Sequence, residues 1–94
     1  MAKAVQARIK FLAHEEGGRL EPARDGIRPQ LELGEIHTSC IVRSICGDQV
    51  FDSGVLYDVE IEIPFWEHYS ALFDHDDPVR LFDGSRLIAT GTYV

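Results

Sequence analysis

Three side chains in the middle of the chain are of types that bind transition metals. His37, Cys40 and Cys46 offer one imidazole and two thiols. Structural zinc sites usually take four ligands as two closely spaced pairs, and no fourth ligand accompanies these three. On the inner face of a strand, Cys40 would simply be a small buried apolar residue. We therefore expect no metal, and two free thiols, because two cysteines are too few for a disulfide framework.

Other arrangements with catalytic potential are incomplete. No G-x-x-x-x-G-K-[ST] phosphate-binding loop follows the Gly17-Gly18 pair, and no G-x-S-x-G nucleophile elbow is present. Glu15 and Glu16 are neighbours in a loop rather than on a rigid pocket wall. The adjacent side chains of residues 75–77 would rarely converge on one ion, and they predict a solvated acidic loop. We expect neither enzymatic activity nor a cofactor.

Large apolar side chains recur at three- and four-residue spacings between residues 65 and 73, which predicts one or two helical turns. Two interpretations are open. The rings close one end of a barrel, or Phe65, Trp66 and Tyr69 form an exposed patch that contacts a protein. Stacking on nucleic-acid bases is disfavoured, because four nearby acids would oppose a phosphate backbone. These acids are Glu67, Asp74, Asp76 and Asp77.

The elements that position these residues belong to one small domain, residues 1–94. No apolar run is long enough for a membrane span. Lys3, Arg8 and Lys10 interrupt any apolar core of a secretion signal, so a cytoplasmic location is expected. The net charge of −7 is uneven, because residues 48–94 hold ten of the sixteen acids and only two of the nine bases. Nucleic-acid contacts would therefore use the first half.

Alternation of apolar and polar residues predicts strands over residues 5–11, 30–33, 37–45, 55–63, 79–82 and 86–94, with a turn at Gly34-Glu35. Asp83-Gly84-Ser85 predicts a hairpin turn between the last two strands. Pro64 ends the strand of residues 55–63. Short strands with close turns favour an all-β antiparallel barrel or sandwich. Residues 14–29 hold three glycines and two prolines without any period, so this long loop is the first place to look for function.

Residues 15–30 read E-E-G-G-R-L-E-P-A-R-D-G-I-R-P-Q. This stretch resembles the signature loop of the third, C-terminal β-barrel domain of elongation factor Tu. The positions that match in type and ungapped spacing are Glu15, Glu16, Gly17, Gly18, Arg19, Pro22, Gly26, Arg28, Pro29 and Gln30. The final hairpin, residues 83–94, and the strand before Pro64 are also similar. The likeness is strong over residues 5–45 and poor over residues 46–54 and 65–79.

The resemblance implies a small six-stranded antiparallel barrel without a GTPase domain. In the family this domain is not catalytic. It packs on the GTPase domain, docks the exchange factor and contacts the T stem of aminoacyl-tRNA. Carried over by position, and with Arg28 of the same loop added, it names six candidates for binding RNA or a partner: Arg19, Arg28, Gln30, Ser39, Asp83 and Gly84.

The chain departs from the family where RNA contact would be made. Leu20 replaces a histidine, Ile63 replaces a basic residue, and the family's loop aromatics are absent. Loss of phosphate contacts weakens RNA binding. We therefore expect docking on a protein of the translation machinery or on a factor that binds one. A reduced module for tRNA-like stems is the alternative. Two further readings stay open: Arg19 and Arg28 pair with loop acids to hold its shape, or the barrel encloses a ligand pocket.

Overall fold

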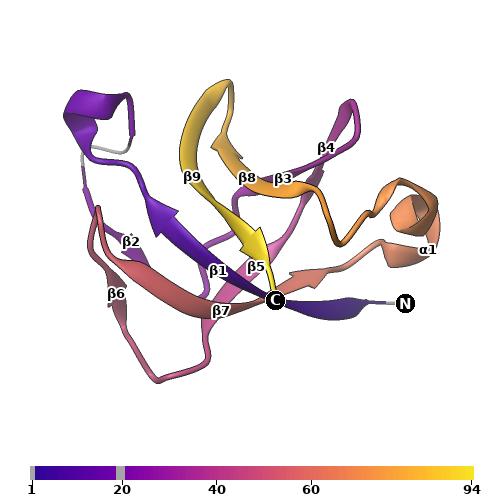
Figure 1. Cartoon of the computed structure of the whole chain (residues 1–94), viewed down its shortest axis with the longest axis horizontal. Helices are drawn as coiled ribbons and strands as arrows, with labels where there is room; N and C mark the ends of the chain where they lie inside the picture. The colour runs from indigo at the N-terminus through magenta and orange to yellow at the C-terminus, as the bar shows by residue number, and fades with distance from the viewer. Residues whose placement is uncertain (1, 19–20) are drawn as a thin grey trace.

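The computed structural model describes residues 2–18 and 21–94, and its regular structure is mostly β (Figure 1). The strands are β1 (Lys3–Phe11), β2 (Ala23–Arg24), β3 (Gln30–Leu33), β4 (Ile36–Ser39), β5 (Ile41–Ser44), β6 (Val50–Phe51), β7 (Leu56–Ile63), β8 (Pro78–Asp83) and β9 (Arg86–Tyr93). Three short helical pieces join them: η1 (His14–Glu16), α1 (Trp66–Tyr69) and η2 (Ser70–Leu72). The all-β prediction is confirmed.

Seven of the described strands form one antiparallel sheet in the order β4-β3-β8-β9-β1-β7-β5, and β2 pairs with β6. The large sheet curls into a half-barrel (Figure 1). Its two end strands, β4 and β5, are consecutive in the chain and are separated only by Cys40. The Cys40 N–H donates to the carbonyl of Pro29 at 3.1 Å instead of joining a ladder. The prediction of six strands is therefore wrong as a count, because one bent segment makes two strands and a small second sheet is added.

The core is built by the alternation that the sequence predicts. Ala7 and Ile9 of β1 and Val59 and Ile61 of β7 are all buried, and Ala7 lies directly opposite Val59 in the ladder. Leucines of β3 and β8 close the same interior. Each fully buried side chain of this size stabilises the fold by roughly 1.5–3 kcal/mol. The alternation of buried and exposed positions continues from Thr38 through Cys40 to Val42, so Cys40 does lie on the inner face of the sheet as a small buried residue.

The outer face of the sheet pairs charges from the two halves of the sequence. Arg8 on β1 lies directly opposite Asp58 on β7, and its Nε lies 2.9 Å from the Asp58 Oδ1. Arg43 on β5 places Nη1 2.7 Å from Glu62 Oε1. The acidic face of β7, which carries Asp58, Glu60 and Glu62, is thus partly neutralised by arginines from the first half of the sequence.

Residues 66–72 form the helical turns that the apolar spacing predicts, as α1 and η2. Residues 14–29 are more regular than predicted, because they include η1 and the two-residue strand β2. Within the described ranges, no helix is long and apolar enough to cross a membrane.

Candidate binding face

The first half of the loop formed by residues 15–30 is shaped by backbone contacts around its glycine pair, Gly17 and Gly18. The Glu16 Oε1 accepts a hydrogen bond from the Ala13 N–H at 3.0 Å. Gly17 has a φ of +91°, a left-handed conformation that L side chains rarely adopt. Gly18 is buried, and a Cβ there would overlap the Leu12 carbonyl oxygen. The matched Glu-Gly-Gly residues therefore have a structural role in this chain.

The second half of the loop is fastened to β5. The Ser44 N–H donates to Asp25 Oδ1 at 2.7 Å, and the Val42 N–H donates to the carbonyl of Ile27 at 2.9 Å. These bonds hold residues 25–27 against a strand of the large sheet. Arg28, which follows directly, is thus presented by a fixed backbone.

Five of the six predicted binding residues gather on one face, which we name the loop face: Arg28, Gln30, Ser39, Asp83 and Gly84. Four of them line a pocket of about 310 Å³. β3 and its preceding loop contribute Gln30 and Arg28, and the end of β8 and the turn after it contribute Asp83 and Gly84. Ser39 is the direct partner of Gln30 across the β3–β4 ladder. The sixth candidate, Arg19, lies outside the described residues.

Apolar side chains line the base of this pocket, and charges of opposite sign stand at its rim. Ile88 is 1% exposed and Phe82 is 9% exposed. Arg28 and Asp83 are both exposed. Neither has an ion pair within the part of the chain that the structure describes. The face therefore offers a cation, an anion and the amide of Gln30 around an apolar base.

The alternative in which Arg28 pairs with loop acids is wrong for the described residues. Glu16 and Asp25 accept hydrogen bonds from backbone N–H groups instead, as given above. Glu15 is exposed and forms no ion pair with Arg28. Among the described residues, the guanidinium of Arg28 is therefore left without an acidic partner.

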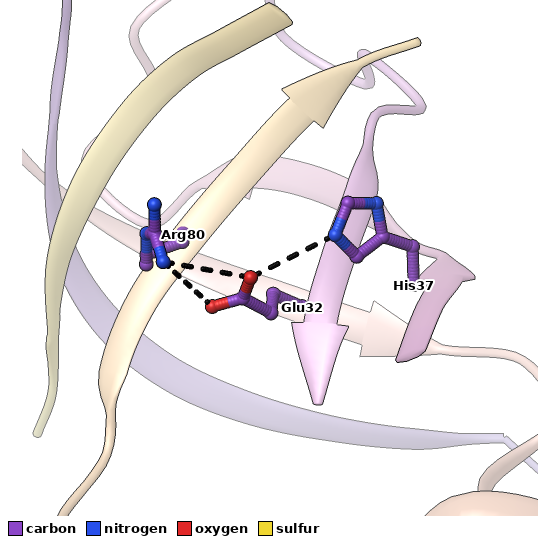
Figure 2. Close-up of polar contacts among 3 residues, drawn as sticks. All are labelled: Glu32, His37 and Arg80. Carbon is purple, nitrogen blue, oxygen red and sulfur yellow. Dashed lines mark hydrogen bonds and ion pairs between the residues drawn. The ribbon is translucent and has the colours of Figure 1, made fainter. Parts of the chain in front are cut away.

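A polar network that the sequence did not reveal borders the loop face. Figure 2 shows Glu32 of β3 between Arg80 of β8 and His37 of β4. Glu32 Oε2 lies 3.1 Å from Arg80 Nη1, and Glu32 Oε1 lies 3.7 Å from His37 Nε2. The His37 ring stacks on Phe82 at a centroid distance of 4.4 Å, and Arg80 lies over the same ring. The network covers Phe82, whose only sequence signal was its place in a predicted strand.

The predicted aromatic patch divides into two environments. Trp66 and Tyr69 are partly buried and pack against the core, as the barrel-closing interpretation expects. The Trp66 ring meets Phe73 edge-on at 5.4 Å, and Lys3 Nζ lies 5.2 Å from the Trp66 ring centroid. Phe65 alone of the three is largely exposed, at 53%.

The candidate metal ligands lie in unlike surroundings. Cys40 is fully buried and its Sγ contacts the Pro29 carbonyl at 3.6 Å, whereas Cys46 is exposed, and both are free thiols. Burial raises the pKa of the Cys40 thiol to about 12. His37 is on the outer face, against Phe82. Within residues 2–18 and 21–94, no three His, Cys, Asp or Glu side chains are placed to hold one metal ion.

A second pocket lies between the end of β1 and the small sheet. Its volume is about 250 Å³, and Phe11 and Phe51 line it together with Ala23. The two phenylalanine rings stack at 5.2 Å. It is a cavity that no motif in the sequence indicated.

No family model matches this chain, and no curated protein matches it. The likeness to the third domain of elongation factor Tu therefore depends on the residues of the 15–30 loop and on the closing hairpin, and it remains a resemblance.

Proposed function

We propose that this chain is a non-catalytic binding module that resembles the C-terminal barrel domain of elongation factor Tu. It docks on a protein of the translation machinery, or on a protein that binds one, through the loop face. The observation that carries the proposal is the convergence of Arg28, Gln30, Asp83 and Gly84 around one pocket, with Ser39 beside it. The four residues that line the pocket come from two segments more than fifty positions apart in the sequence.

The composition of the loop face favours a protein partner. An apolar base with a polar rim is the usual anatomy of a protein–protein interface. Arg28 and Asp83 give the rim both signs of charge, which a complementary protein surface can match. A phosphate backbone would be attracted by Arg28 but repelled by Asp83, and the net charge of −7 adds to that repulsion.

One observation favours RNA as a second candidate. Arg28 has no acidic partner among the described residues, and Arg86 lies just beyond the β8–β9 turn, where its Nη1 donates to the Gly18 carbonyl at 3.4 Å. Two arginines near one pocket can contact phosphates of a tRNA-like stem. Binding of this kind falls steeply with salt, by nearly one logarithmic unit of slope for each phosphate contact.

A pull-down from native lysate, with and without nuclease, tests the two candidates. The tagged wild type is compared with the Arg28→Ala/Gln30→Ala variant. Arg43→Ala is the matched control, because it removes the same charge from an ion pair elsewhere on the sheet. We expect a protein partner that survives nuclease, is lost with the double variant and is kept by the control.

Other outcomes separate the candidates cleanly. Recovery of tRNA that nuclease abolishes, with a salt slope that Arg28→Ala makes shallower, would replace the protein proposal with the RNA one. A partner retained equally by all three proteins would exclude the loop face as its binding surface.

A further inference from the structure

The segment after β7 presents an outward ridge that the core does not use. Phe65, His68 and Leu72 follow one another at spacings of three and four residues, so they share one side of the α1–η2 turns. Phe65 is 53% exposed, Leu72 is 42% exposed, and His68 between them is also exposed. The Phe65 and His68 rings lie 6.5 Å apart. We name these three residues the apolar ridge.

The neighbouring side of the same turns explains why the ridge stays in place. Trp66, Tyr69 and Phe73 pack against the core. The Phe73 ring meets the Tyr93 ring edge-on at 4.8 Å, which ties the segment to β9. The exposed side chains are therefore mounted on an anchored base, and a ligand would pay little for ordering them.

The ridge is flanked by negative charge from two separate elements. Leu72 lies against the β3–β4 turn, where a Cβ on Gly34 would stand 3.8 Å from its Cδ2. The next residue of that turn, Glu35, is exposed. After the ridge the chain continues into Asp74, Asp76 and Asp77, which are all exposed, and the Asp76 side chain is 97% exposed. Residues 64–79 contain no lysine or arginine.

We propose that the apolar ridge docks a short, basic, amphipathic segment of a partner protein. Apolar side chains of that segment would cover Phe65 and Leu72, and its lysines or arginines would meet Glu35 and the aspartates of residues 74–77. This is the helix-on-apolar-face mode of recognition, selected here by charge complementarity. A second copy of this chain is disfavoured as the occupant, because both copies would bring the same acidic surroundings. The proposal does not rest on the function of the loop face.

Fluorescence anisotropy with a labelled peptide tests the docking of a basic amphipathic segment on the apolar ridge. The peptide has about 15 residues, with leucines at i, i+3, i+4 and i+7 and lysines at the other positions. We expect the full chain to bind this peptide, and not the matched peptide with glutamates in place of lysines. Phe65→Ala and Leu72→Ala should each weaken binding by about ten-fold. Leu56→Ala is the matched control, because Leu56 is 63% exposed at the far end of β7.

The charge requirement is tested separately. Glu35→Gln/Asp76→Asn should weaken peptide binding and make it less sensitive to salt, whereas the Asp52→Asn control should not. Equal weakening by Leu56→Ala and Phe65→Ala, or no binding of the lysine peptide, would overturn the proposal. Concentration-dependent dimerisation that Phe65→Ala abolishes would also overturn it, by assigning the ridge to a second copy.

Discussion

The hydroxyl groups of Tyr93 and Tyr57 differ in whether they have a hydrogen-bond partner among the described residues. The Tyr93 hydroxyl is buried and has no hydrogen-bond partner among the described residues. The Tyr57 hydroxyl accepts a hydrogen bond from the Asp52 N–H at 2.8 Å. An unpartnered buried polar group costs about 1–3 kcal/mol, and a typical satisfied bond contributes about 1 kcal/mol.

Phenylalanine at each position should therefore change stability in opposite directions. We expect Tyr93→Phe to raise the free energy of unfolding by up to about 1 kcal/mol and Tyr57→Phe to lower it by about 1 kcal/mol. Urea denaturation followed by Trp66 fluorescence measures both. A Tyr93→Phe protein that is less stable than Tyr57→Phe would show that the buried hydroxyl does have a partner.

The buried thiol of Cys40 predicts a loss of stability at alkaline pH. Burial raises its pKa from 9.0 to about 12 in the folded state, so the unfolded state loses this proton first. The stabilisation is complete below pH 9 and is lost as the pH rises from 9 towards 12. The loss for one group amounts to about 1.4 kcal/mol per pH unit within that window.

Cysteine variants isolate this contribution. Cys40→Ala should shift the whole curve of stability against pH and make its alkaline fall shallower, whereas Cys46→Ala, at an exposed position, should leave the slope unchanged. Denaturant titrations at a series of pH values between 8 and about 11 measure the slope. Parallel curves for wild type and Cys40→Ala would contradict the assignment.

At the scale of elements, α1 is held by Trp66 rather than by its own few backbone bonds. A single helical turn is marginal in water without packing. Trp66 and Phe65 are adjacent, but only Trp66 packs on the core. We expect Trp66→Ala to destabilise the protein by about 3 kcal/mol and Phe65→Ala by less than about 0.5 kcal/mol. Thermal denaturation followed by circular dichroism measures both, and equal losses would contradict the packing that divides these two residues.

Local alternation was sufficient to predict the long strands. β1, β7, β8 and β9 lie within one or two residues of the predicted ranges. β1 and β7 bury every second side chain along most of their length, whereas β8 and β9 each also bury two neighbouring side chains. The interruption at Cys40 leaves the alternation intact, so only the backbone bond to Pro29 reveals it. β2 and β6 have two residues each, too few to show any period.

The candidate site was predictable only in part, because its parts are far apart in sequence. Residues 28–30 and the 83–84 turn meet through the ladder of β3 with β8, and no spacing rule places two such segments together. The resemblance to a known barrel supplied that juxtaposition. The network of Glu32, His37 and Arg80 was missed, because Glu32 and Arg80 are ordinary polar strand positions and His37 was considered only as a metal ligand, until the register aligned the three.

At the scale of the whole molecule, the sixteen acids and nine bases predict that salt stabilises the fold. The longest dimension of the molecule is 34 Å. The screening length is about 30 Å at 0.01 M salt and about 3 Å at 1 M, so at low salt the unbalanced charges repel one another across the whole molecule. Salt also weakens the exposed ion pairs, but such pairs contribute about 1 kcal/mol or less each. We therefore expect the thermal midpoint to rise as NaCl increases from about 0.01 M to about 1 M.

Asp76→Lys tests whether this rise comes from the net charge. The Asp76 side chain is 97% exposed, so its replacement disturbs no packing. Exchanging one negative charge for one positive charge adds two to the net charge and brings it from −7 to −5. The variant should have a higher midpoint than wild type at low salt, and the two midpoints should converge near 1 M, where screening removes the difference. Differential scanning calorimetry across the salt series measures both. A wild-type midpoint that falls steadily with salt would mean instead that the cross-strand pairs of Arg8, Arg43 and Arg80 outweigh the repulsion among the remaining acids.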